Sequence, residues 1–138
     1  MDRKEFLSLV GVGTAGLACG ACFEACAADD EIASPPTNVD FTLDLTAPEN
    51  TPLTNVGGYI YKDRIIVAHV KSGSYAAVSS ICTHAGSTVY YDLTIDRFHC
   101  PNHGSNYLTD GTVANGPAPS PLMRYNTTLS GSSLRVNS

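Results

Sequence analysis

The sequence predicts an all-β protein, in the form of a small antiparallel β sandwich or barrel. Short segments alternate apolar and polar residues, as half-buried strands do. Turn-forming Gly, Pro, Asn, Asp and Ser residues separate these segments at short intervals. After residue 30, no segment repeats its apolar residues at the helical period of about 3.6. Seven Tyr and four Phe supply a modest aromatic core, although Trp is absent.

The expected strands each run from one cluster of turn residues to the next. They are 39–45, a hairpin over 57–70 that turns at 62–64, 75–81, 88–91, 96–99, 123–129 and 133–136. The third of these ends at Cys82, and the hairpin formed by 88–91 and 96–99 ends at Cys100. Two hairpin loops therefore carry the two cysteines of the folded domain.

The chain divides into three parts by composition. Residues 1–27 have a basic head, an apolar Gly- and Ala-rich middle and a small-residue exit, which is the order of an export signal or of a membrane or lipid anchor. Residues 28–38 are acidic and then Pro-rich, which is typical of a linker. Residues 39–138 form the folded domain, which is long enough for one core.

The N-terminal segment allows three fates. Arg3 and Lys4, followed by an apolar run, resemble a twin-arginine export signal with Lys in the second position. Small residues favour cleavage after Ala27, whereas Cys26 is the most favourable of three cysteines for lipidation. The third fate is retention as a membrane helix. All three predict a periplasmic or extracytoplasmic protein, and the last two anchor it to lipid or to a membrane.

Charge and cysteine content narrow the class of protein. Charged residues make up 15% of the chain, and the formal net charge is −5. Because no basic cluster follows the first few residues, we expect no nucleic-acid partner. Only Cys82 and Cys100 lie in the folded domain, and two cysteines of an exported domain often form one disulfide.

Two short motifs each place a Cys near a His, so they could bind metal rather than form a disulfide. They are C-T-H-A-G at 82–86 and C-P-N-H-G-S at 100–105. A disulfide would leave His84 and His103 unexplained. Two thiolates and two imidazoles also suit zinc, although structural zinc sites usually pair Cys with Cys and His with His along the chain. The third interpretation is a [2Fe–2S] cluster in which the two cysteines hold one iron and the two histidines hold the other.

Both motifs resemble the C-x-H and C-x-x-H loops of the Rieske family in content, order and approximate separation. The resemblance extends to S-N-Y at 105–107 and to G-P-A-P-S-P-L at 116–122, which is similar to the proline loop that covers the cluster in that family. It covers the chain from about residue 55 to the end. It implies a Rieske-type fold, with a cluster-binding subdomain formed by two hairpin loops.

The resemblance also implies roles for individual residues. Cys82, His84, Cys100 and His103 would bind one [2Fe–2S] cluster, with the histidines on the outer iron. Ser105 resembles the serine that donates to a bridging sulfide, and Tyr107 resembles the tyrosine that donates to a ligand cysteine. Both donors would stabilise the reduced cluster and raise its potential. His99 and His69 are expected to be non-ligands.

One departure concerns the positions next to the ligands. High-potential members of the family brace the cluster with a disulfide, whose cysteines are replaced in this chain by Ser87 and Asn102. The ferredoxin-type members also lack this brace. We therefore expect an intermediate potential within the roughly −150 to +300 mV span of Rieske centres.

The predicted function is one-electron transfer on the extracytoplasmic side of a bacterial membrane, as a carrier or as the small subunit of a redox complex. No self-contained catalytic site is evident. The expected redox partner is a cytochrome, the large subunit of a molybdenum oxidase or a quinol-oxidising complex, and the missing disulfide counts against the last. The alternative is a zinc-stabilised extracytoplasmic binding module without redox activity, held by the same two Cys and two His.

Overall fold

The apolar run at 65–68 forms the most deeply buried strand of the domain, β3 (Ile65–His69). In this strand, Ile65 and Val67 belong to one hydrophobic core, whereas Ile66 and Ala68 belong to another. Alternate side chains of a strand point to opposite faces. Because both faces of β3 are covered, its sequence is continuously apolar.

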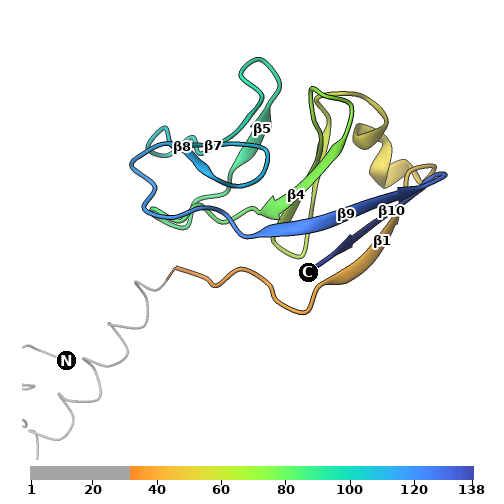
Figure 1. Ribbon diagram of the computed structural model, residues 1–138, viewed down its shortest axis with the longest axis horizontal. Helices are drawn as coiled ribbons and strands as arrows, with labels where there is room; N and C mark the ends of the chain where they lie inside the picture. Colours follow the sequence, from red (N-terminus) through yellow and green to blue (C-terminus); the bar gives the residue numbers. More distant parts are fainter. Residues whose placement is uncertain (1–31) are drawn as a thin grey trace, which may run out of the picture. The chain divides into compact units, whose positions relative to one another are not determined.

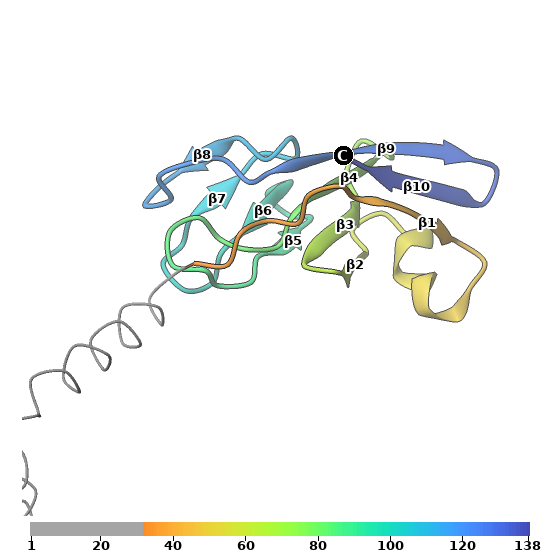
Figure 2. The ribbon, with the colours of Figure 1, turned by 90° about the horizontal axis from the view of Figure 1, so that it is seen from below.

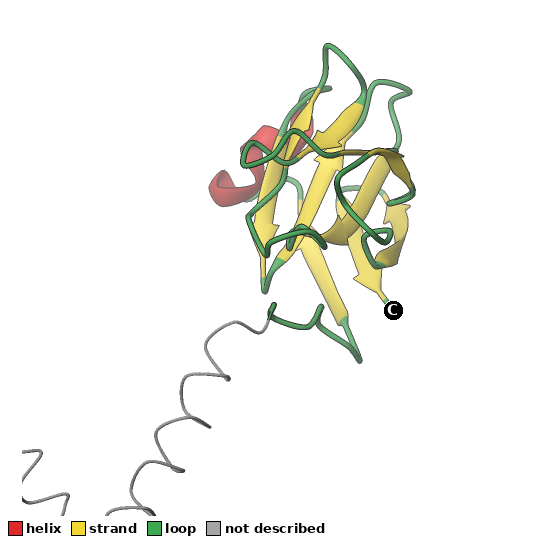
Figure 3. Ribbon diagram, turned by 90° about the vertical axis from the view of Figure 1, so that its left-hand side faces the viewer, coloured by secondary structure: helices red, strands yellow, loops and turns green. Residues whose placement is uncertain are grey.

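The computed structural model describes residues 32–138, which contain ten strands and one short 3-10 helix. The export signal or anchor expected at 1–27 lies outside the described residues, as do residues 28–31 of the expected linker. Residues Ala33–Ser138 form one compact unit. Figure 3 shows that strands and loops account for nearly all of this unit.

One antiparallel sheet has six strands in the order β1-β10-β9-β4-β3-β2. The strands other than β3 are β1 (Asp40–Asp44), β2 (Tyr59–Lys62), β4 (Tyr75–Ser79), β9 (Arg124–Ser130) and β10 (Ser133–Asn137). Leu43 of β1 and Leu134 of β10 belong to the same core as Ile65 of β3. The two halves of the sheet therefore curl over one another to enclose this core.

A second antiparallel sheet has four short strands in the order β5-β6-β7-β8. These are β5 (Tyr90–Asp92), β6 (Arg97–His99), β7 (Asn106–Tyr107) and β8 (Val113–Asn115). Its buried residues Tyr91 and Phe98 belong to one core with Ile66 and Val78 of the larger sheet. In Figures 1 and 2 the smaller sheet lies at one end of the unit and the helix at the other.

The turn between β2 and β3 confirms the hairpin expected at 57–70. Asp63 and Arg64 both have positive φ angles, of 50° and 64°. Two such residues in succession match the right-handed twist of the strands on either side of a tight turn. The other expected strands are also present within a few residues of their predicted limits, which confirms the all-β fold class.

Three elements were not expected from the sequence. The 3-10 helix η1 (Pro48–Thr54) is too short to show a helical period, and it is held by side chains such as Asn50, whose Nδ2 donates to Asp44 O at 2.8 Å. β7 has two residues and β8 has three, so neither is long enough to show alternation. Within residues 32–138, no helix has the length and apolar character needed to cross a membrane.

Candidate metal centre

The first Cys/His loop, 82–87, connects β4 to β5. An isolated bridge between Ile81 and Thr88 closes its base. Within the loop, Cys82 N–H donates to Ser87 O at 2.7 Å, and Gly86 N–H donates to Cys82 O at 2.9 Å. Gly86 has a φ of 75°, a conformation that residues with a Cβ rarely adopt. This glycine therefore allows the loop to turn back within six residues.

The second loop, 100–105, connects β6 to β7 and repeats the same backbone pattern. Cys100 N–H donates to Ser105 O at 2.8 Å, and Gly104 N–H donates to Cys100 O at 3.0 Å. Gly104 also has a positive φ, of 80°. Both loops are thus six-residue turns that begin at Cys and end in Gly-Ser. They differ in the position of the histidine, which comes third in the first loop and fourth in the second.

The two histidines face each other across the gap between the loops. Nδ1 of His84 lies 3.1 Å from Nδ1 of His103, and the planes of the two rings are nearly perpendicular, at 89°. Two imidazole nitrogens about 2.0–2.1 Å from one tetrahedral metal would lie roughly 3.3 Å apart. The spacing of these Nδ1 atoms therefore fits two ligands of one metal ion.

The two cysteines are free thiols, and both are buried. Each thiol affects the ionisation of the other, and backbone N–H groups of its own loop favour its charged form. For Cys82 these N–H groups are those of His84 and Ala85, and for Cys100 they are those of Asn102 and His103. The structure thus gives no support to a disulfide between Cys82 and Cys100, and it provides donors for charged sulfur.

These surroundings affect the two thiols in opposite directions. Burial opposes ionisation of Cys82, but the Tyr107 hydroxyl and the backbone donors outweigh it, so the pKa of Cys82 lies below its usual value. Burial, followed by the neighbouring Cys82 sulfur, raises the pKa of Cys100. The pKa of Tyr107 rises to about 12, chiefly through burial and also through its contact with Cys82.

Among residues 32–138, no three Cys, His, Asp or Glu side chains gather closely enough to surround a single metal ion. The four residues expected as ligands form two pairs instead, one of buried thiols and one of imidazoles nearer the surface. His84 is half-buried and His103 is exposed. A group containing two metal ions, each held by one pair, fits this arrangement.

Tyr107 reaches the first loop from β7, in the core of the smaller sheet. Its Oη lies 3.3 Å from Cys82 Sγ. It also accepts the backbone N–H of Thr83 at 3.2 Å and lies 3.1 Å from Thr83 Oγ1. The structure therefore brings Tyr107 to the cysteine sulfur, as expected. The role of Thr83 between them is a feature that the sequence analysis missed.

Ser105 ends the second loop and is fully buried. Its Oγ accepts the backbone N–H of Ala118 at 3.1 Å. The hydrogen bonds of the described residues provide no protein acceptor for its own hydroxyl hydrogen. A buried donor without an acceptor is costly, so this hydroxyl suits a bound group that offers one, such as a sulfide.

Segment 116–122 contacts both loops. It accepts the hydroxyl of Thr83 at Ser120 O, at 2.6 Å, and it donates from Ala118 N–H to Ser105. Asn115, just before the segment, donates from Nδ2 to Gly104 O at 3.1 Å. The segment that resembles a proline loop is therefore hydrogen-bonded to both Cys/His loops.

The remaining histidines lie outside this group, as expected. The ring nitrogens of His69 lie 2.9 Å from Leu53 O and 3.1 Å from Gly73 O. Nδ1 of His99 lies 2.6 Å from Asn106 Oδ1, although His99 is next to Cys100 in the chain. Alternation along β6 explains this, since neighbouring side chains point to opposite faces.

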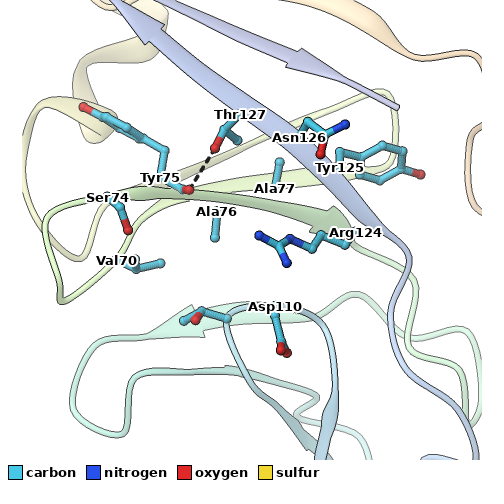
Figure 4. Close-up of a pocket in the computed structure, with 11 residues that line it drawn as sticks. Val70, Ser74, Tyr75, Ala76, Ala77, Asp110, Arg124, Tyr125, Asn126 and Thr127 are labelled. Carbon is cyan, nitrogen blue, oxygen red and sulfur yellow. Dashed lines mark hydrogen bonds between the residues drawn. The ribbon is translucent and has the colours of Figure 1, made fainter.

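A separate pocket of about 220 Å³ lies between β4, β9 and the turn that contains Asp110. Figure 4 shows the Arg124 side chain extending into this pocket and Thr127 bonded to the carbonyl of Tyr75. None of the Cys and His residues of the two loops lines it. The pocket is therefore distinct from the candidate metal centre.

The fold and this centre define a class of protein: a small all-β domain with a candidate metal centre between two loops of similar backbone structure. Residues 41–126 match the Rieske [2Fe-2S] domain family. This match covers more than half of the chain, and the chain belongs to that family. It therefore carries one Rieske-type [2Fe–2S] cluster and transfers electrons.

Relatives in this family include iron-sulfur subunits of the cytochrome b6-f complex. The subunit from Chlorobaculum tepidum is 37% identical over 97 residues, which cover 68% of this chain and 53% of the relative. The subunit from Prochlorococcus marinus (strain MIT 9301) is 31% identical over 135 residues, which cover 86% of this chain and 75% of the relative. The chain therefore spans about half the length of the first relative and three quarters of the second.

Solved structures with the same fold come from several kinds of Rieske protein. The cyanobacterial plasma membrane Rieske protein PetC3 from Synechocystis PCC 6803 is 31% identical, with a TM-score of 0.51, over 59% of this chain and 85% of the other. The ferredoxin of carbazole 1,9a-dioxygenase from Nocardioides aromaticivorans IC177 is 21% identical, with a TM-score of 0.51, over 76% and 98% of the two chains. At that identity the second similarity shows the fold alone.

Proposed function

We propose that Cys82 and Cys100 hold one iron of the cluster and that His84 and His103 hold the other. The observation that carries this proposal is the arrangement in two pairs: two buried thiols that influence each other's ionisation, and two imidazoles whose Nδ1 atoms lie 3.1 Å apart. Thiolate and imidazole in this division are the ligands of Rieske centres. The bound cluster supplies the change of one electron in valence.

The protein residues set where and at what potential that electron is exchanged. The histidines lie at the accessible end of the centre, so an electron leaves or enters through their rings. The Tyr107 hydroxyl and the Ser105 hydroxyl are the donors that favour the more negative reduced state. The burial of both cysteines keeps water from the inner half of the centre.

Replacement of the histidines one at a time tests the ligand assignment. We expect His84→Cys and His103→Cys each to shift the visible absorption spectrum of the purified native chain or to abolish its iron. The matched control is His99→Cys, which adds a thiol beside Cys100 on the opposite face of β6 and leaves the spectrum unchanged. An unaltered spectrum in both loop variants excludes these histidines as ligands. Native protein that contains zinc and no iron would contradict the cluster itself.

For the partner, we propose a quinol-oxidising membrane complex of the cytochrome b6-f kind, in which this chain is the iron-sulfur subunit. The names of the relatives support this choice over a cytochrome or a molybdenum oxidase as the partner. They outweigh the argument from Ser87 and Asn102, where the absence of a disulfide favoured a ferredoxin-type carrier. Co-purification of the native protein with a cytochrome b-type subunit supports the proposal, and isolation with a molybdenum enzyme contradicts it.

We also propose that the chain acts on the extracytoplasmic side of a bacterial membrane. Residues 1–27 are the export signal or anchor, 28–38 the linker and 39–138 the redox domain. The basic and apolar composition of the N-terminal segment supports this proposal. The mass of the native protein's N-terminal peptide distinguishes a cleaved, a lipidated and a retained segment. Export is tested with a fused reporter that works only in the cytoplasm, and activity of that reporter would contradict export.

A further inference from the structure

Thr83 lies between Cys82 and His84, and its hydroxyl has two contacts. Oγ1 donates to Ser120 O at 2.6 Å and lies 3.1 Å from Tyr107 Oη. A hydroxyl has a single hydrogen, and the carbonyl of Ser120 can only accept. Toward Tyr107, therefore, Thr83 Oγ1 can act only as an acceptor.

Tyr107 also has a single hydroxyl hydrogen, and the structure offers it two acceptors. One is Cys82 Sγ at 3.3 Å, and the other is Thr83 Oγ1 at 3.1 Å. The backbone N–H of Thr83 donates to the same oxygen at 3.2 Å, and this bond points a lone pair of Tyr107 toward the loop. The hydrogen of Tyr107 is therefore shared between a ligand sulfur and a neighbouring side chain.

We infer that Thr83 is a positioning residue that draws the Tyr107 hydrogen away from Cys82 and so holds the reduction potential below the value that Tyr107 alone would set. This inference rests on the proposed role of Cys82 as a ligand. A hydrogen bond to a ligand sulfur stabilises the more negative, reduced cluster, so a weakened bond lowers the potential. Because Ser120 O accepts the hydrogen of the Thr83 hydroxyl, segment 116–122 takes part in setting the potential.

Thr83→Val tests the inference, because valine has nearly the shape of threonine without its hydroxyl. The reduction potential of the full, cluster-loaded chain is measured by redox titration followed by circular dichroism. We expect Thr83→Val to raise the potential above that of the wild type. Thr83→Ser, which keeps the hydroxyl, is the matched control and retains the wild-type value. An unchanged or lower potential in Thr83→Val with the cluster intact overturns the inference.

A double-mutant cycle shows whether Thr83 acts through Tyr107. We expect Tyr107→Phe alone to lower the potential, and Thr83→Val combined with Tyr107→Phe to match Tyr107→Phe alone. If Thr83→Val still raises the potential in the double variant, it acts by another route and the inference is wrong. If Tyr107→Phe alone leaves the potential unchanged, the Tyr107 hydroxyl does not act on Cys82 and the inference is overturned, whereas the proposed liganding by Cys82 is tested separately by loss of the cluster in Cys82→Ala.

If Thr83→Val loses the cluster, the potential of the smaller variant Thr83→Ala is measured instead. We expect the same rise in potential for it. The carbonyl of Ser120 belongs to an exposed residue, so water can replace the lost donor in either variant. Loss of the cluster in both variants, with retention in Thr83→Ser, would make Thr83 a purely structural residue and overturn the inference.

Discussion

Three aspartates adopt the same local structure, and each precedes a threonine by two residues. Oδ1 of Asp44, Asp92 and Asp110 accepts both the backbone N–H and the hydroxyl of Thr46, Thr94 and Thr112, respectively. The threonine hydroxyl, and then its backbone N–H, lowers the pKa of each carboxyl below the usual 3.8. These bonds favour the ionised form in the folded state.

This repeated motif predicts a small loss of stability in acid. A folded-state pKa that lies below the unfolded value contributes stability above the unfolded pKa, and the contribution disappears as the pH falls through the folded value. We expect the free energy of unfolding to fall from about pH 4 downward. The triple variant Asp44→Asn, Asp92→Asn, Asp110→Asn keeps an acceptor without a charge, so urea titrations should show a flatter pH dependence. An equally steep dependence contradicts this origin.

Ser105 combines a structural and a redox contact in one hydroxyl. Its removal in Ser105→Ala leaves the buried Ala118 N–H without its acceptor, which costs about 1–3 kcal/mol of unfolding free energy. The same change removes a donor to the proposed cluster, so we expect a lower reduction potential. Ser87→Ala, at the matching position of the first loop, is the control and leaves the potential nearly unchanged. Equal potentials for wild type and Ser105→Ala would contradict the redox contact.

At the scale of elements, segment 116–122 depends on the turn that precedes it. Leu122 N–H donates to Gly111 O at 2.8 Å, and a Cβ built on Gly111 would lie 2.5 Å from Leu122 O. Gly111 has a φ of 92°, and Gly73 has nearly the same φ, of 90°, with no atom within 4 Å of a Cβ built there. The two glycines thus share a conformation but differ in crowding.

This difference predicts unequal costs for the same substitution. Gly73→Ala should cost about 1–2 kcal/mol of unfolding free energy for the left-handed conformation alone. Gly111→Ala adds a backbone clash worth a further 1–3 kcal/mol or so, and it displaces the segment that contacts both cluster loops. We expect faster loss of visible absorbance on heating for Gly111→Ala than for Gly73→Ala. Similar rates would show that the segment does not protect the cluster.

Across the whole molecule, charge is distributed unevenly. Residues 32–138 contain seven Asp or Glu and six Lys or Arg, so they account for only −1 of the formal net charge of −5, and the loops 82–87 and 100–105 and segment 116–122 contain none of these charged residues. Ala85, Pro101 and Pro119 are exposed in these three segments. A partner that binds at the histidines therefore meets an uncharged surface, which neither attracts nor repels charge.

This distribution predicts electron exchange that depends little on salt. We expect the rates with anionic ferricyanide and with cationic cobalt tris(phenanthroline) to vary little between about 0.02 and 0.5 M salt, where screening changes strongly. Ala85→Lys, next to His84, should give a faster and salt-sensitive reaction with ferricyanide. A salt dependence of the wild type as steep as that of Ala85→Lys would place electron exchange elsewhere on the surface.

The sequence could predict those parts of the fold that depend on short-range patterns of residues. Strand β3 and its neighbours follow from apolar periods and turn residues that lie within ten positions of one another. The four candidate ligands were also visible, because each loop places one Cys and one His beside Gly-Ser. Helix η1 and strands β7 and β8 were missed, because seven, two and three residues are too few for any period to appear.

The sequence by itself therefore determined the fold class, the family and the residue types available to hold a cluster. Only the tertiary structure decided how those residues are paired and which hydrogen atoms reach them. The bonds from Tyr107 to Cys82 and from Thr83 to Ser120 span 25 and 37 positions of the chain. Such contacts depend on how separate sheets and loops meet in space, and no local pattern of residues specifies that.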